Sequence, residues 1–236
     1  MRIGVPREYN TTELDSVVRL VWQKALVCLA QEGHEVIAVS LPATKLALPA
    51  YYVLAPAEAS SNLAKFDGVR YGSPASSTKH GQDVLFATGR GENLGDEVRR
   101  RILLGSFTLS ASAIDNYFIK AQQIRRLVQQ DFDAIFSSSN PLQADNIQPN
   151  GVDILLTPTA PSLPPRLAEL AQRTPIDSYK DDVLTVPASL AGLPAISVPA
   201  QVKECECIGL QLIGQYGDDD FVLRAAEILE SSLQKQ

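Results

Sequence analysis

Three consecutive arginines, Arg99 to Arg101, are the first residues whose type and spacing suggest a chemical role. They lie in a segment with helical spacing, where consecutive side chains spread over three directions. Because Ile102 and the two leucines behind it must be partly buried, one arginine is expected to point toward a cleft. There its planar fork could bind a carboxylate with two hydrogen bonds. The alternative is that all three are solvated and pair with Glu92, Asp96 and Glu97.

A pair of adjacent carboxylates, Asp181 and Asp182, precedes a long apolar stretch punctuated by prolines, Val183 to Pro199. Carboxylates at the entrance to an apolar segment are candidates for acid–base chemistry. The alternative is that they cap a helix, because the unsatisfied N–H groups of a helix N-terminus favour negative charge. The two roles are compatible if different members of the pair carry them.

The serine runs of the sequence do not predict a nucleophile. A catalytic hydroxyl needs a nearby base and backbone N–H groups that converge on the oxyanion. Ser60–Ser61 and Ser137–Ser139 lack the flanking glycines that would allow this. The chain has only two histidines, His34 and His80, and His80 falls in a polar segment where we expect it to be solvated. A histidine-based triad is therefore poorly supported.

The three cysteines, Cys28, Cys205 and Cys207, predict neither a disulfide scaffold nor a metal site. Their number is odd and the chain is not small, unlike disulfide-stabilised domains. Cys28 falls in an apolar helical stripe and is expected to be a small core residue. Cys205 and Cys207 would lie on one face of a strand, whereas a zinc knuckle needs two intervening residues and a second pair.

The composition is that of an ordinary globular protein, with 45% hydrophobic and 20% charged residues. A length of 236 residues suits one large domain or a sizeable part of one. The net charge of −6 argues against a broad nucleic-acid-binding surface, so any contact with RNA would be local or made by a partner. No apolar run reaches the roughly 18 residues of a membrane span. We also find no signal-peptide or transit pattern after Arg2.

Strand-like and helix-like segments alternate, which predicts an α/β protein, and no linker divides it into separate domains. The first strand ends at Pro6, Asp15 caps the helix that follows, and Gly33 ends that helix. This strand–helix–strand unit is expected to be parallel with a right-handed crossover. The predicted strands are Met1–Pro6, Glu35–Leu41, Val152–Thr157, Ala195–Val198 and Ile208–Ile213, and the predicted helices are Asp15–Gln31, Tyr51–Phe66, Asp96–Ser110, Ala113–Phe132 and Asp218–Leu233.

Two polar segments are predicted to be loops. Gly72–Gly95 is rich in glycine, serine and threonine and shows no clear periodicity. Phe136–Gly151 contains two prolines and ends in Asn-Gly, and we expect it to be an exposed, mobile loop.

Several stretches resemble the A-type subunits of the glutamyl-tRNA(Gln) amidotransferases, a branch of the amidase signature family. The most specific is PAEASSNLAKFDGVRYG, from Pro56 to Gly72. The resemblance covers nearly the whole chain, and it implies the amidase-signature fold, a mixed β-sheet flanked by helices. The other matching stretches are EVRRRILLGSFTLSA (97–111), ILLTPTAPS (154–162), DDVLTVPASLAGLPAISVPA (181–200) and GLQLIG (209–214).

The Gly/Ser-rich nucleophile segment of that family, of the form GGSSGGS, occurs nowhere in the sequence. In the family one serine attacks the amide carbonyl, a second serine relays the proton, and a lysine is the base. The resemblance therefore implies that residues 1–236 are the C-terminal portion of a single amidase-signature domain without its N-terminal, nucleophile-bearing half. No catalytic residue is expected in this chain. Residues 136–151 look like a loop insertion, because the family usually passes directly from the helix to the next strand.

The resemblance implies three glutamine-binding residues. Arg101 in RRRILLG matches the family's carboxylate-binding arginine, and Asp182 in DDVLTVP matches its ammonium-binding aspartate. Tyr51 in ALPAYYV matches a pocket tyrosine near the amide. Arg100 and Tyr52 are the alternatives if the match is displaced by one residue.

In this family glutamine hydrolysis supplies the ammonia that converts Glu-tRNA(Gln) to Gln-tRNA(Gln) for translation. The resemblance implies a B-type subunit that holds ATP and Mg²⁺ and most of the tRNA, a small C- or F-type subunit, and no cofactor or metal in this chain. The residue choice is more similar to fungal mitochondrial members than to bacterial ones, which would be cytoplasmic. Two alternatives stay open: a non-catalytic docking half that needs a partner, and a fragment of another amidase-signature amide hydrolase.

Overall fold

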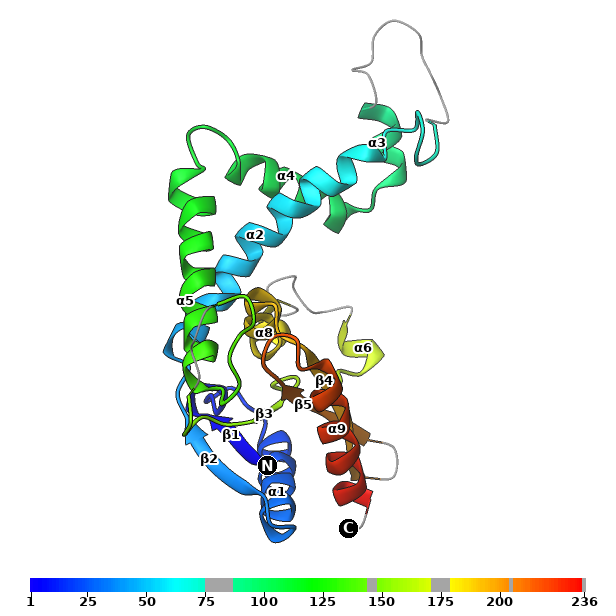
Figure 1. Cartoon of the computed structure of the whole chain (residues 1–236). Helices are drawn as coiled ribbons and strands as arrows, with labels where there is room; N and C mark the ends of the chain where they lie inside the picture. The colour runs from blue at the N-terminus through cyan, green and yellow to red at the C-terminus, as the bar shows by residue number, and fades with distance from the viewer. Residues whose placement is uncertain (75–86, 144–147, 171–178, 204–205, 235–236) are drawn as a thin grey trace, which may run out of the picture. The chain divides into compact units, whose positions relative to one another are not determined.

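The computed structural model describes residues 1–74, 87–143, 148–170, 179–203 and 206–234. They form two compact units (Figure 1). Unit 1 consists of Met1–Leu48 and Arg125–Gln236, and unit 2 of Pro49–Ile124. The sequence predicts a single unit without a boundary. The boundaries fall inside two helices, α2 (Ala47–Asn62) and α5 (Lys120–Ile135), so no proline- or glycine-rich linker marks them.

Unit 1 is built on a five-stranded sheet in the order β2-β1-β3-β5-β4. Strand β1 is parallel to both β2 and β3, whereas β5 is antiparallel to β3 and β4. The sheet is therefore mixed, as the sequence predicts. Its strands are β1 (Arg2–Pro6), β2 (Glu35–Val39), β3 (Ile154–Pro158), β4 (Ala195–Lys203) and β5 (Glu206–Ile213).

The first strand–helix–strand unit forms with the predicted parallel pairing. Helix α1 (Ser16–Gln31) begins after Asp15, whose Oδ1 accepts a hydrogen bond of 2.7 Å from the backbone N–H of Val17. The chain leaves the helix through Gly33, whose φ of +90° is in the region that favours glycine. Strand β2 then pairs with β1 in parallel, with Gly4 opposite Ile37.

Two helices cover one face of the sheet, α1 and α9 (Asp219–Gln234). They contact each other, and both contact β4 (Figure 1). The indole N–H of Trp22 on α1 donates a hydrogen bond of 3.0 Å to the carbonyl of Leu156 on β3. Val222 and Leu229 of α9 are buried with Trp22 in the core. Strand β3 is buried along its whole length, which agrees with its continuous apolar sequence.

The segment after α5 is anchored at its described residues, in contrast to the exposed, mobile loop that its composition predicts. Asn140 is buried and donates a hydrogen bond of 3.1 Å to Oδ1 of Asp133, and Gln143 donates one of 2.7 Å to Oδ2 of the same carboxylate. Ser138 donates to Asp218 at 2.9 Å. The polar composition predicts a solvated loop, but several of these side chains bind acceptors of unit 1 instead of water.

Unit 2 contains α2, α3 (Ala87–Asn93), α4 (Asp96–Thr108) and a π-helical turn, Asp115–Ile119. Helix α2 begins four residues before the predicted start. Helix α3 lies in the segment predicted to be a loop. A Cβ added to Gly105 of α4 would overlap the carbonyl of Pro56 in α2, so the two helix backbones approach closely there. The small residues of α2 allow such a close approach.

The remaining helices of the described chain are short. They are the 3₁₀ turns Arg7–Tyr9, Pro42–Leu46, Leu63–Lys65 and Asp182–Leu184 (η5), together with α6 (Leu167–Leu170) and α8 (Val186–Ala191). Helix α8 is joined to α5 by hydrogen bonds from Arg125 to the carbonyl of Leu190 and from Gln129 to that of Ala191. None of the helices in the described ranges is long and apolar enough to cross a membrane.

Candidate functional site

The arginine triplet occupies the first turns of α4 and is paired with acidic residues of the same helix. Arg99 pairs with Asp96, and Arg100 pairs with Glu97. Nε of Arg101 donates a hydrogen bond of 3.1 Å to the other carboxylate oxygen of Glu97. The structure thus shows the helical ion pairs with Asp96 and Glu97 that the sequence offered as one alternative. A carboxylate ligand at Arg101 would have to compete with Glu97.

Arg101 is still the most protected of the three arginines. Its side chain is 38% exposed, against 47% for Arg99 and 49% for Arg100. The acidic partners lie in the first turn of α4, where the helix dipole also favours negative charge.

Tyr51 lies in α2 and is half-buried. Its ring packs edge-on against the ring of Tyr52, with a centroid distance of 5.3 Å and an interplanar angle of 84°. This geometry is a favourable one for an aromatic pair. Tyr51 and Arg101 both belong to unit 2, whereas Asp182 belongs to unit 1.

Asp182 is the first residue of η5 and is held there by the backbone. Its carbonyl accepts hydrogen bonds from the N–H and the hydroxyl of Thr185, at 3.1 and 3.2 Å. Asp181 occupies the N-cap position, but its side chain makes no capping hydrogen bond. The capping role proposed for this pair is therefore not observed at Asp181.

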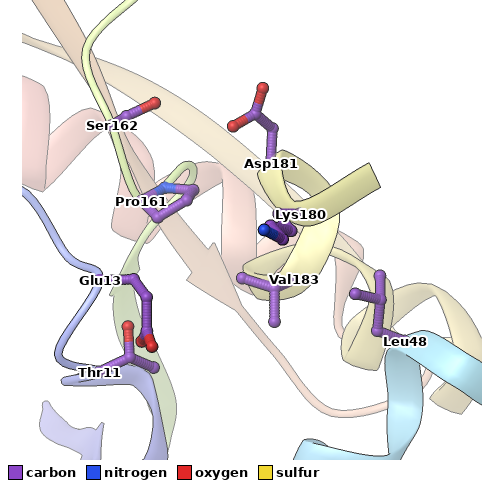
Figure 2. Close-up of a pocket in the computed structure, with 8 residues that line it drawn as sticks. All are labelled: Thr11, Glu13, Leu48, Pro161, Ser162, Lys180, Asp181 and Val183. Carbon is purple, nitrogen blue, oxygen red and sulfur yellow. The ribbon is translucent and has the colours of Figure 1, made fainter. Parts of the chain in front are cut away.

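A cavity of about 580 Å³ lies in unit 1 beside Asp181 (Figure 2). Figure 2 shows Lys180, Asp181 and Val183 on the short helix, and Thr11 and Glu13 on the loop before α1. The remaining lining residues are Leu48, Pro161 and Ser162. The cavity therefore combines an apolar wall with two carboxylates, one ammonium group and two hydroxyls.

The charged groups of the cavity suit a small ligand that carries both signs of charge. The pKa of Glu13 is lowered by its own backbone N–H and by the hydroxyls of Thr12 and Thr11, with a smaller effect from the charge of Lys180. Glu13 is therefore ionised at neutral pH. Sequence reasoning missed Glu13 and Lys180. They are far apart in the chain, and neither lies in a motif that would connect them.

Other residues considered from the sequence have structural roles or lie outside the described chain. The hydroxyl of Ser60 donates to the carbonyl of Ala57 within α2, at 2.8 Å. Cys28 is partly exposed, not buried in the core as expected, because the buried side of α1 passes through Ala25 and Leu29. His80, Cys205 and the side chain of Cys207 lie outside the described residues. Among the residues that are described, no three His, Cys, Asp or Glu side chains group as metal ligands would.

The fold and the sequence together define the class of protein: the chain belongs to the amidase family, whose model matches residues 1–223. The particular relatives are fungal. The chain is 53% identical over 251 residues to the mitochondrial A-type subunit of the glutamyl-tRNA(Gln) amidotransferase of Emericella nidulans, a match that covers 98% of this chain and 50% of the relative. It is 53% identical over 246 residues to the protein of the same description from Coccidioides posadasii, covering 98% of this chain and 49% of that one.

A solved structure agrees with these sequences. The A-type subunit of the glutamyl-tRNA(Gln) amidotransferase of Thermotoga maritima matches with a TM-score of 0.68 and 34% identity, covering 98% of this chain and 42% of that chain. The chain thus spans about half the length of the curated relatives it matches. A structure of an amidase at 24% identity, with a TM-score of 0.69, supports the fold alone.

Proposed function

We propose that this chain is the C-terminal, glutamine-recognition half of the A-type subunit of a mitochondrial glutamyl-tRNA(Gln) amidotransferase. The observation that carries the proposal is the 53% identity to the Emericella nidulans relative, which extends over 98% of this chain. The family's nucleophile segment does not occur in the 236 residues. Hydrolysis of glutamine would therefore need the other half of the domain, which corresponds to the part of the relatives that this chain does not cover.

In this proposal two charged residues recognise the α-amino acid end of glutamine. The guanidinium of Arg101 binds the carboxylate, because its fork matches two oxygens. Asp182 binds the α-ammonium group, and Tyr51 contacts the amide end. Support comes from the protected position of Arg101 in the triplet and from the backbone turn that fixes Asp182. The cavity beside Asp181 offers charges of both signs close to Asp182 in the chain.

The proposal also names the assembly. Ammonia released from glutamine passes to a B-type subunit, which holds ATP and Mg²⁺ and binds most of the Glu-tRNA(Gln), and a small C- or F-type subunit completes the complex. The acidic composition of this chain supports a division of labour in which tRNA is bound elsewhere. The fungal relatives described as mitochondrial support the same compartment for this protein.

The test is a joined protein in which the unmatched half of the Emericella nidulans relative precedes the 236-residue chain. We expect it to hydrolyse glutamine, and we expect Arg101→Ala and Asp182→Ala each to lower kcat/KM by about 100-fold, the size expected when one partner of a hydrogen-bonded charge pair is removed. Arg99→Ala is the matched control. It removes the same group from the same triplet and should leave kcat/KM nearly unchanged.

The outcomes separate the assignments. Full activity in both Arg101→Ala and Asp182→Ala would contradict the site. An inactive joined protein that is folded would contradict the glutaminase function. Hydrolysis of another small amide, with no competition by glutamine, would favour a different amide hydrolase of the same family.

A further inference from the structure

In the described part of the chain, the helices of unit 1 leave one side of β4 open. Successive strand residues point to opposite faces. On the side of α1 and α9, Val198 and Ala200 are buried. Ala195, Ser197 and Pro199 alternate with the buried residues, so they point the other way, and all three are exposed. We call this open surface the Ser197 face; it consists of Ala195, Ser197 and Pro199 of β4, Gly209 of β5, and Thr159 after β3.

A pair of hydroxyls lies at the centre of the Ser197 face. Oγ of Ser197 and Oγ1 of Thr159 are 2.7 Å apart, and they come from segments on either side of β5. Gly209 of β5 makes this approach possible. A Cβ added there would lie 2.6 Å from Oγ1 of Thr159 and closer still to Oγ of Ser197. Any larger residue at 209 would separate the two hydroxyls.

Below this pair, two buried polar groups have no hydrogen-bond partner, Oγ1 of Thr157 and Nε2 of Gln211. Thr157 is 0% exposed and Gln211 is 3% exposed. In the sheet register Gln211 stands opposite Thr157 on one side and opposite Ser197 on the other. The three residues therefore form a polar row on one face, with its exposed end at Ser197. Native proteins rarely leave buried polar groups unpaired, so this row points to a missing partner.

The fungal relatives indicate what that partner is. They match 98% of this chain, but the chain covers only about half of the length of each relative. An amidase-family domain therefore contains about as much polypeptide again. The Ser197 face is lined by small residues and proline, which allow another backbone to come close. Its hydroxyls can donate to or accept from main-chain groups.

We propose that the Ser197 face is the surface on which the remaining portion of an amidase-family domain packs. Main-chain groups of that portion hydrogen-bond to the Ser197–Thr159 pair, and the row through Gln211 and Thr157 rearranges to complete its hydrogen bonds. The proposal rests on the family membership and on the half-domain part of the proposed function. It does not depend on glutamine as the substrate.

The experiment measures association in the absence of glutamine, so its result is independent of the glutaminase assay. The 236-residue chain is mixed with the separately produced unmatched half of the Emericella nidulans relative, and Kd is measured by calorimetry. We expect a complex of one copy of each, and we expect Ser197→Arg to weaken it at least tenfold. Leu223→Arg is the matched control, because Leu223 is exposed on α9 on the opposite side of the sheet and the variant should bind normally.

Thr157→Val gives a second readout, because it should affect the stability of the chain alone and the affinity of the complex in opposite directions. It removes a buried, unpaired hydroxyl from the chain alone, so the chain alone should be as stable as the wild type or more stable. The complex should weaken by about tenfold, as expected for the loss of one hydrogen bond formed on association. A merely structural hydroxyl would give the reverse pattern, with a destabilised chain and unchanged Kd.

Both variants are repeated in the joined protein used for the glutaminase test, so that poor folding of the isolated half does not decide the result. There Ser197→Arg should lower Tm by about 4 °C or more, with no change in Tm for the 236-residue chain alone. Equal effects of Ser197→Arg and Leu223→Arg would overturn the proposal. So would unfolding of the chain alone by Ser197→Arg, which would mean that its own residues cover the face. Self-association of the chain through the Ser197 face would also overturn the proposal, because the face would then bind a second copy of the chain.

Discussion

Unit 1 and unit 2 bury different kinds of side chain. Unit 1 buries large residues from its strands and helices, including Trp22, Phe132, Leu155 and Leu212. In the described part of unit 2, the buried hydrophobic residues are all alanines: Ala50, Ala57, Ala113 and Ala121. Its large apolar residues are either exposed, as Leu103 and Phe107 are, or only partly buried.

The difference indicates how each unit is stabilised. Burial of a large apolar side chain contributes roughly 1.5–3 kcal/mol, so the core of unit 1 provides most of the hydrophobic stabilisation of the chain. Unit 2 depends on close backbone contact between helices, such as the one between Gly105 and Pro56. Unit 2 should therefore open at a lower denaturant concentration than unit 1.

The largest expected effect comes from the core of unit 1. Leu155 is fully buried in β3, and Leu155→Ala should lower the free energy of unfolding of unit 1 by about 2–5 kcal/mol. Leu103→Ala in α4 is the control, because Leu103 is 71% exposed and should change stability by less than about 0.5 kcal/mol. Urea unfolding monitored by hydrogen exchange measures the stability change of each variant. Similar losses would break the contrast between the units.

A smaller effect is expected at the helix contact of unit 2. Gly105→Ala places a methyl group against the Pro56 carbonyl, and we expect it to destabilise unit 2 by about 1–3 kcal/mol. Faster exchange of the amides in α2 and α4, with β3 unchanged, would show this. Gly91→Ala is the matched control in α3, where a Cβ meets nothing within 4 Å. It should be neutral or stabilise by about 0.5–1 kcal/mol. Unchanged exchange in Gly105→Ala would show that the helices can separate without loss.

The smallest effect depends on pH and is confined to unit 1. Burial raises the pKa of Glu8, but hydrogen bonds from the Ser40 hydroxyl and the Leu41 N–H outweigh it, and the net pKa is below the usual 4.5. This carboxylate therefore contributes stability that is complete above pH 4.5 and is lost as the pH falls through the lowered folded pKa.

The wild type should exceed Glu8→Gln in stability at neutral pH, and the difference should shrink as the pH falls below the usual glutamate pKa. Urea midpoints between about pH 3 and about pH 7 measure it, since these limits lie roughly one unit or more on either side of that pKa. Glu227→Gln, at an exposed position on α9, is the control and should show no such convergence. A constant difference across the series would contradict the assignment to Glu8.

Much of unit 1 could be predicted from local signals. The structure confirms three of these signals. Strand β1 ends at Pro6, Asp15 caps the start of α1, and Gly33 forms the turn between α1 and β2. The apolar run at β3 and the final amphipathic helix are also confirmed, within one or two residues. These elements follow from capping, turn chemistry and periodicity, which act within a few residues.

Other features escaped prediction because they depend on distant contacts or on exceptions to a local rule. Helix α2 begins before Pro49, since proline is tolerated in the first turn of a helix. The two-unit division is hidden because α2 and α5 run through its boundaries. Glu13 and Lys180 line one cavity although no sequence pattern relates them. The glutamine-binding roles of Arg101, Asp182 and Tyr51 stay a prediction from the family resemblance.

The hydrogen bond from Trp22 to Leu156 has an optical consequence. Trp22 is the only tryptophan of the chain, and it is 3% exposed against the central strand of unit 1. Tryptophan emission therefore reports on the sheet of unit 1, because unit 2 has no tryptophan. Four of the seven tyrosines, Tyr51, Tyr52, Tyr71 and Tyr117, belong to unit 2, and the other three belong to unit 1. In an unlabelled sample, a denaturation in which part of the tyrosine absorbance changes before the tryptophan emission would therefore record the opening of unit 2 ahead of unit 1.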